Sequence, residues 1–204
     1  MQIDHLIYAA PDLAAAVADL EDRFGVRAQA GGSHPGLGTH NALLALGPQT
    51  YLEIIAPDPE QPEPAARHPF VAGHLDRGAL VSWALTGDDI DQAVAAARSQ
   101  GYDPGEIVDG QRVTSAGTVL RWRATGSARA SGLVPFLISW GDTQHPARSA
   151  PPGLSLESLR IEHPEPASLT PALIALGAGI DVIPAAAPAL VATLSSPAGP
   201  QVLR

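Results

Sequence analysis

Three stretches of this chain open with the same pattern, and this repetition sets narrow limits on the fold. The first stretch begins with an apolar extended run at residues 3–8, turns at Pro11 and Asp12, and continues as a helical pattern up to Gly25. Asp is a favoured helix N-cap, and glycine commonly ends a helix. Extended patterns follow at residues 26–29, 40–46 and 51–55. The predicted order is therefore strand, helix and three strands, written βαβββ.

The same order returns after a proline- and glutamate-rich stretch at residues 56–66, which we interpret as a surface linker. An apolar run at residues 79–85 precedes Asp88 and Asp89, either of which can cap a helix that ends before Gly101. Further strands are predicted at residues 106–108, 118–123 and 134–140. This second stretch is thus predicted to be another βαβββ module.

A second proline-rich joint at residues 144–153 precedes a shorter third start. There the pattern predicts a strand at residues 154–162 and a helix that ends before Gly177, followed by short closing strands at residue 182 and at residues 189–194 and 201–203. We therefore predict a first module with its linker at residues 1–66, a second module at residues 67–150, and a partial third βαβ-type unit at residues 151–204, packed on the same domain.

The predicted fold class is α+β. Short helices cannot cover both faces of such sheets, so we expect the tandem modules to form one curved, cup-shaped mixed sheet with its helices outside. The concave face of the sheet is then a natural pocket for a small molecule. The alternative is an ordinary α+β sandwich in which side chains fill the concavity.

Composition excludes several classes of function. The chain has 204 residues, 45% of them hydrophobic and 16% charged, which is typical of a globular protein. It contains no cysteine, and all 12 basic residues are arginine, so cysteine nucleophiles and Schiff-base lysines are excluded. A net charge of −9 without a basic cluster indicates neither nucleic acid nor a membrane as partner. With no signal peptide or membrane span evident, we expect a cytoplasmic protein with a small-molecule ligand.

Several motifs resemble the glyoxalase-like branch of the vicinal oxygen chelate superfamily. In the first module they are Asp-His-Leu at residues 4–6, the glycine-rich stretch at residues 31–44, and Tyr-Leu-Glu-Ile-Ile-Ala at residues 51–56. In the second module they lie at residues 122–123, 135–140 and 145–146. The resemblance implies paired βαβββ modules around a cup, often with a divalent metal in it, and a protein that can form a homodimer. Known chemistry of the superfamily includes isomerisation, epimerisation, ring cleavage by dioxygen and thiol addition, whereas some members only sequester a drug.

His5 and Glu53 are the residues with the clearest chemical potential. Each lies inside an apolar strand, where an unpaired imidazole or carboxylate would be costly to bury. The resemblance places a metal-ligating histidine in the first strand of a module and a glutamate in its last strand, and His5 and Glu53 fill those two places. Such a pair suits zinc, iron, manganese or nickel. Glu53 could instead pair with Arg121 or Arg123, or face solvent.

The second module departs from this metal-binding pattern. Aligning Asp89 with Asp12 puts Ser82 at the position of His5, and puts Leu137 or Ile138 at the position of Glu53. The third unit has Ser158 at the histidine position. A complete metal site would therefore need another donor, either from a partner chain or from His34, His40, His68 or His74. A divalent metal and no cofactor at all both stay open.

Other residues are candidates for binding or catalysis. His34 and His40 lie in a glycine-rich stretch that we interpret as a loop lining the pocket, with Asn41 beside them as a further substrate-binding candidate. Glu53 or His40 could move a proton. Arg121 and Arg123 share one strand face and could clamp an anionic group on a substrate, although solvent-facing arginines are equally consistent with the pattern. Trp140 could stack on a ligand, and the simpler interpretation is that it is a core residue.

Three hypotheses for function follow. The leading one is an enzyme acting on a small oxygen-bearing substrate, metal-dependent if His5 and Glu53 hold an ion, and of lyase, isomerase or dioxygenase type. The rival is a metal-free protein that binds or sequesters a small molecule. The third is an interaction or structural module whose cup is filled by side chains.

Overall fold

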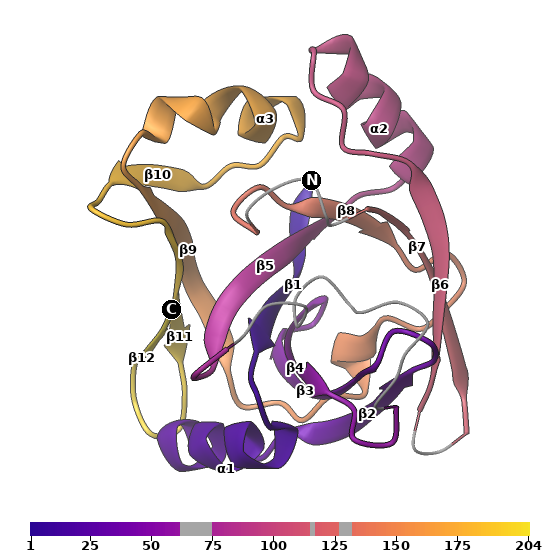
Figure 1. Ribbon diagram of the computed structural model, residues 1–204, viewed down its shortest axis with the longest axis vertical. Helices are drawn as coiled ribbons and strands as arrows, with labels where there is room; N and C mark the ends of the chain where they lie inside the picture. Colours follow the sequence, from indigo (N-terminus) through magenta and orange to yellow (C-terminus); the bar gives the residue numbers. More distant parts are fainter. Residues whose placement is uncertain (62–74, 115–116, 127–131) are drawn as a thin grey trace.

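The protein is described by a computed structural model over residues 1–61, 75–114, 117–126 and 132–204. The described residues form a strongly curved eight-stranded sheet in the order β2-β3-β4-β1-β5-β8-β7-β6, and a four-stranded sheet in the order β10-β9-β11-β12 (Figure 1). Both sheets mix parallel and antiparallel pairs. The predicted cup-shaped α+β fold is confirmed.

The first module has the predicted βαβββ order. Its elements are β1 (Gln2–Ala9), α1 (Leu13–Phe24), β2 (Gln29–His34), β3 (Thr39–Gly47) and β4 (Thr50–Pro57). Asp12 caps α1, because its carboxylate accepts a hydrogen bond of 2.8 Å from the backbone N–H of Ala15. Gly25 ends α1 in the left-handed conformation, with φ of 73°. The buried face of α1 packs into the core between the two sheets.

The second module repeats this order with β5 (Ala79–Thr86), α2 (Ile90–Ser99), β6 (Ile107–Val113), β7 (Val119–Thr125) and β8 (Phe136–Ser139). Asp89 caps α2 by accepting hydrogen bonds from the backbone N–H groups of Asp91 and Gln92. Strands β1 and β5 pair antiparallel and join the two modules at the centre of the sheet. The sheet is thus continuous from one module to the other.

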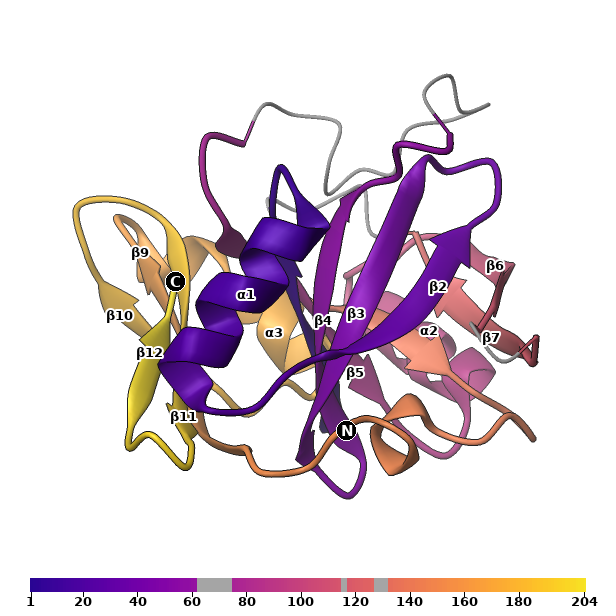
Figure 2. The same cartoon turned by 90° about the horizontal axis from the view of Figure 1, so that it is seen from below.

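The two edges of the eight-stranded sheet curl toward each other until β2 lies beside β6 (Figures 1 and 2). A Cβ atom built on Gly32 of β2 would lie 2.1 Å from the carbonyl oxygen of Val113 in β6. Only glycine permits this approach. The sheet therefore forms a nearly closed cup.

This close approach explains one difference from the sequence-based prediction. The glycine-rich stretch was predicted to be a loop, yet residues 31–34 belong to β2, with residues 35–38 between β2 and β3. His40 lies in β3, which contains the strand predicted at residues 40–46. The glycines of β2 are not turn residues; they are needed because neighbouring atoms pack closely against β2 and leave no room for a side chain. At Gly31, a Cβ would lie 2.1 Å from the side-chain oxygen of Asn41.

The third unit forms the four-stranded sheet. Its elements are β9 (Ser155–His163), α3 (Thr170–Ala175), β10 (Asp181–Pro184), β11 (Ala189–Ser195) and β12 (Gln201–Leu203), with a short 3-10 helix at Pro166–Ser168. Another 3-10 helix, at Pro146–Arg148, lies in the joint that precedes this unit. Its apolar residues belong to the same buried cluster as Leu6, Leu20 and Trp83 of the first two modules. The backbone N–H of Leu80 also donates to the carbonyl of Arg204, at 2.8 Å.

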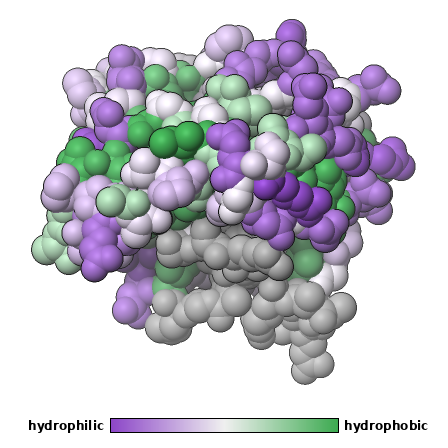
Figure 3. Space-filling view, turned by 90° about the horizontal axis from the view of Figure 1, so that it is seen from above, coloured by the Kyte–Doolittle hydropathy of each residue, from purple (hydrophilic) through white to green (hydrophobic). Residues whose placement is uncertain are grey.

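Among the described residues, no helix is long and apolar enough to cross a membrane. On the face shown in Figure 3, hydrophilic side chains surround several separate apolar patches.

Candidate functional site

The concave side of the eight-stranded sheet holds a cavity of about 340 Å³. The first module contributes mainly polar groups to its wall, and the second contributes mainly aromatic and aliphatic side chains. A larger groove of about 1060 Å³ lies beside α1, but its described lining includes no histidine and no buried carboxylate. The cavity is therefore the candidate site.

Glu53 lies at the centre of the polar wall. It pairs with Ile7 of β1 on one side and with Leu43 of β3 on the other, and its side chain is buried, with the residue 8% exposed. Asn41 lies two residues from Leu43 and on the same face of β3. Its amide nitrogen donates a hydrogen bond of 2.5 Å to Oε1 of Glu53.

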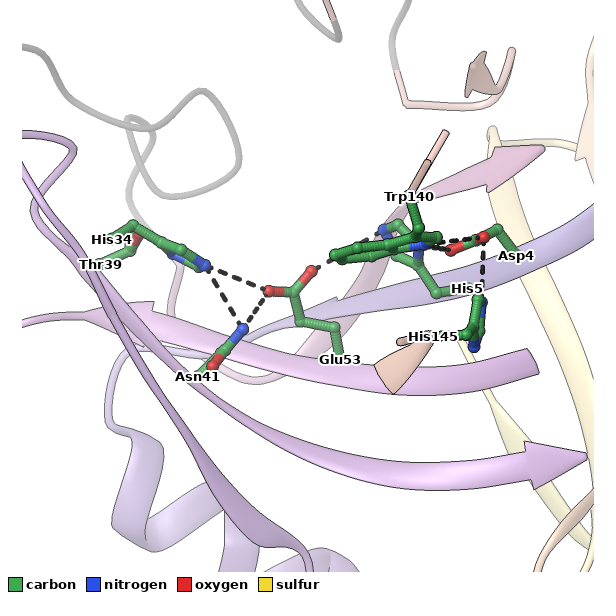
Figure 4. Close-up of polar contacts among 8 residues, drawn as sticks. All are labelled: Asp4, His5, His34, Thr39, Asn41, Glu53, Trp140 and His145. Atoms are coloured by element: carbon green, nitrogen blue, oxygen red, sulfur yellow. Dashed lines mark hydrogen bonds and ion pairs between the residues drawn. The ribbon is translucent and has the colours of Figure 1, made fainter. Parts of the chain in front are cut away.

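Two histidines face this carboxylate from opposite sides (Figure 4). Nε2 of His5 lies 3.9 Å from Oε2 of Glu53, and Nε2 of His34 lies 3.8 Å from Oε1. His34 is held through Nδ1, which is 2.8 Å from the hydroxyl of Thr39. Burial lowers the pKa of His34, so its imidazole is neutral at pH 7.

His5 is held in turn by a buried carboxylate. Asp4 is 0% exposed, and its Oδ1 lies 2.7 Å from Nδ1 of His5. Neighbouring residues of a regular strand point to opposite faces, but the register between β1 and β5 shifts between Ile3 and His5, and such irregularities re-aim side chains. The Asp4 bond places the His5 proton on Nδ1 and leaves the Nε2 lone pair toward Glu53 when the ring is neutral.

Asp4 also holds two groups of the segment that follows β8. It accepts hydrogen bonds from Nε2 of His145 at 3.1 Å and from the indole N–H of Trp140 at 3.1 and 3.3 Å. Nδ1 of His145 accepts from the backbone N–H of Ala147, which places the ring proton on Nε2. Burial by itself would raise the pKa of Asp4, but the hydrogen bonds from His145 and His5 outweigh it and lower that pKa, so Asp4 is ionised.

Aromatic rings line the rest of the wall around His5. The His5 ring stacks on Tyr51 with centroids 4.7 Å apart and meets Phe136 of β8 edge-on at 5.5 Å. Burial, followed by the charges of Asp4 and Glu53, raises the pKa of Tyr51 well above its usual value, so its phenol stays protonated. Trp122 and Trp140 add further aromatic surface from the second module, with centroids 5.6 Å apart.

The donor atoms do not fit a divalent metal as they are spaced. Among the described residues, no group of three or more histidine, aspartate or glutamate side chains could hold an ion. His5 and His34 face different oxygens of Glu53, and both N–O distances exceed the separation of about 3.4 Å between tetrahedral ligands that are each bonded at about 2.1 Å. The second module does not compensate, since Ser82 is not part of the cavity lining and Ile138 presents an apolar side chain to it.

One buried charged residue of the second module lines the cavity. Arg112 in β6 is 4% exposed, and its guanidinium donates a hydrogen bond of 2.7 Å to the carbonyl of Gly31 in β2. This bond joins the two edge strands of the sheet.

Five of the predicted site residues line the cavity, namely His5, His34, Asn41, Glu53 and Trp140. The other three do not. His40 is next to Asn41 in β3, and alternation along the strand turns it to the opposite face. Arg121 and Arg123 are exposed on the outer face of β7, where Arg123 donates to Asp91 at 2.6 and 3.0 Å. His68 and His74 lie outside the described residues.

Several residues of the site have no role predicted from the sequence: Asp4, Tyr51, Arg112, Trp122 and His145. The sequence contains a feature that could have indicated two of them. Asp4 precedes His5 directly, and His145 belongs to a motif already noted at residues 145–146. Arg112 could not have been identified from the sequence, because it lies in a polar segment in which no pattern indicates a buried residue.

Residues 3–177 match the model of a family described as a glyoxalase-like domain. A search of curated proteins found no match. Among solved structures, a hypothetical protein from Staphylococcus aureus aligns over 92% of this chain and 87% of its own, with 14% sequence identity and a TM-score of 0.68, which supports the fold alone.

Two methylmalonyl-CoA epimerases align less well. The enzyme from Mycobacterium tuberculosis covers 67% of this chain and 85% of its own, with 23% identity and a TM-score of 0.44. A variant of the Streptomyces coelicolor enzyme, in complex with 2-nitronate-propionyl-CoA, covers 72% and 99%, with 19% identity and a TM-score of 0.48.

Proposed function

This chain belongs to the glyoxalase-like domain family, as its motifs predicted, and we propose that it is an isomerase that shifts a proton beside a carbonyl group of a small molecule in the cavity. The observation that carries the proposal is the Glu53 carboxylate, which is buried on the cavity wall between two imidazoles and fixed by Asn41. A positioned carboxylate in a site shielded from water is well suited to act as a general base.

The proposed step needs no oxidant and no second reactant. Oε1 of Glu53 accepts a hydrogen bond from Asn41, and Oε2 takes a proton from the substrate carbon next to the carbonyl. The electron pair of the broken C–H bond moves to the carbonyl oxygen and gives an enolate. In a 2-hydroxycarbonyl compound, the protonated Glu53 then gives the proton to the former carbonyl carbon while the hydroxyl proton moves to the enolate oxygen. In a compound without that hydroxyl, the proton returns to the carbon that lost it. In both cases the Glu53 carboxylate is regenerated. His5, whose Nδ1 is held by Asp4, lies beside this oxygen, with its Nε2 at 3.9 Å from Oε2.

The experiment is solvent-deuterium exchange followed by proton NMR. The protein is incubated in D₂O with a panel of 2-hydroxyaldehydes, 2-hydroxyketones, 2-oxo acids and thioesters. We expect at least one compound to lose the NMR signal of the C–H group beside its carbonyl faster in the presence of the protein than in its absence. The Glu53→Gln variant should not increase this exchange rate. Glu157→Gln, an exposed carboxylate of β9, is the matched control and should exchange like the wild type.

The rival is a metal-free binding protein, which the aromatic wall supports. It predicts that compounds of the panel bind without exchange, and that a His5→Ala/Glu53→Gln double variant keeps their affinity. Binding of this kind with no exchange in any compound would overturn the isomerase proposal.

A metal held by His5 and Glu53 is the remaining alternative. Since the described donors do not fit an ion, we expect exchange to persist after dialysis against a chelator, with no stimulation by zinc, iron, manganese or nickel. Loss of exchange on chelation, and its return with one of these ions, would favour the metal instead.

A further inference from the structure

Arg112 is a buried cation with an unfilled capacity for hydrogen bonds. A guanidinium has five N–H donors, and the carbonyl of Gly31 is the one acceptor that Arg112 has among the described residues. No described carboxylate forms an ion pair with it. A buried charge without a counter-ion costs several kcal/mol, and buried charges in proteins are therefore usually paired with an opposite charge.

Arg112 borders the cavity that holds Glu53. It lines the same 340 Å³ space, and it also borders a smaller cavity of about 210 Å³ whose lining includes Gly31. Its charge also acts on His34 and Tyr51, which lie across the cavity wall, and in each it works to lower the pKa.

We propose that the cavity binds small carboxylate compounds, with the carboxylate group held by the Arg112 guanidinium. This inference rests on the proposed function, because it names the class of substrate on which Glu53 acts. A guanidinium matches a carboxylate in a two-point arrangement of parallel hydrogen bonds. A monoanion neutralises the single cation, whereas a doubly charged phosphate would leave an excess negative charge in a cavity that already holds Glu53.

The test uses acetate, the carboxylate of the smallest plausible size with an apolar end, and its neutral counterpart acetamide. Trp122 and Trp140 line the cavity, so tryptophan fluorescence reports occupancy. We expect saturable binding of acetate with a Kd on the order of 1–30 mM, as befits a four-atom ligand, and no saturation by acetamide or inorganic phosphate.

Variants of Arg112 distinguish a role in binding acetate from a role in stabilising the fold. Arg112→Gln should raise the Kd for acetate at least about tenfold, and Arg112→Lys should give an intermediate value, because an ammonium keeps the charge without the two-point fit. Arg121→Gln, on the outer face of β7, should bind as the wild type does. Because Arg112 also joins β2 to β6, each variant is first shown to be folded by circular dichroism; Arg112→Lys serves if Arg112→Gln does not fold.

The inference is overturned if acetate binds Arg112→Lys and the wild type equally, if acetamide or phosphate binds as tightly as acetate, or if acetate shows no saturation. Its failure is distinguishable from failure of the proposed function. If the protein exchanges deuterium into neutral ketones but does not bind acetate, the isomerase proposal stands and carboxylate binding by Arg112 is wrong. If it binds acetate but exchanges deuterium into no compound, carboxylate binding stands and the isomerase proposal is wrong.

Discussion

At the scale of single residues, Asp4 organises the wall behind His5. Its carboxylate accepts from His5, His145 and Trp140, which come from two distant parts of the chain. In Asp4→Asn, the amide NH₂ group would face a ring N–H of His5 or His145 and leave a buried donor unpaired. We expect a loss of about 1–3 kcal/mol in the free energy of unfolding, measured by urea denaturation. Asp142→Asn, at an exposed turn, should change it by less than about 0.5 kcal/mol, and equal losses in the two variants would contradict this account.

His34 gives a prediction about pH. Burial lowers its pKa in the folded state below the ordinary value of 6.5, so the unfolded chain binds this proton more readily. Its contribution to stability is therefore complete above pH 6.5 and is lost as the pH falls through the lowered pKa. We expect the free energy of unfolding to fall from pH 7 to pH 5, and the slope to be smaller in His34→Gln. An unchanged slope in this variant would show that another group is responsible.

The sequence revealed which residues of the first module carry chemistry better than it revealed their partners. His5 and Glu53 stood out because polar groups inside apolar strands need a reason. The partner of Glu53 could not be deduced, because Asn41 reaches it only through the register of β3 against β4. Similarly, Arg121 and Arg123 were distinguishable from Arg112 only once the curvature of the sheet was known.

At the scale of elements, the closure of the cup depends on the contact of β2 with β6. A Cβ at Gly32 would collide with the backbone carbonyl of Val113, which cannot move without shifting β6. Gly36 also has a positive φ, but its Cβ would meet nothing within 4 Å. We expect Gly32→Ala to cost about 1–3 kcal/mol more than Gly36→Ala in the free energy of unfolding. Similar losses in the two variants would mean that β2 and β6 can move apart without lowering the free energy of unfolding.

The elements themselves were largely predictable, because their signals are local. Asp12, Asp89 and Gly25 mark helix ends by chemistry that does not depend on the rest of the fold. The error at the start of β2 has the opposite cause. Gly31 and Gly32 were interpreted as turn residues, whereas their lack of a side chain lets Asn41 and β6 pack closely against β2. No local sequence pattern indicates what packs against a strand.

At the scale of the whole molecule, the third unit shares its core with the first two modules. We therefore expect the chain to unfold as one unit. The tryptophans, at positions 83, 122 and 140, all lie in the first two modules, so their fluorescence reports on those modules, while far-ultraviolet circular dichroism reports on every element. The two transitions in urea should coincide. A second transition seen only by circular dichroism would show that residues 151–204 unfold separately.

The family and the cup follow from pattern and motif, but the reaction does not, because it depends on how a few side chains converge. The central claim is that Glu53 transfers the proton. Its most direct test is the rate of deuterium exchange, at saturating concentration of an exchanging compound, in Glu53→Gln and the wild type. Gln keeps an oxygen that can accept from Asn41, so the fold and ligand affinity should be retained while the rate falls by about 10²–10⁴-fold. A folded Glu53→Gln that binds the compound and exchanges it at the wild-type rate would contradict the account.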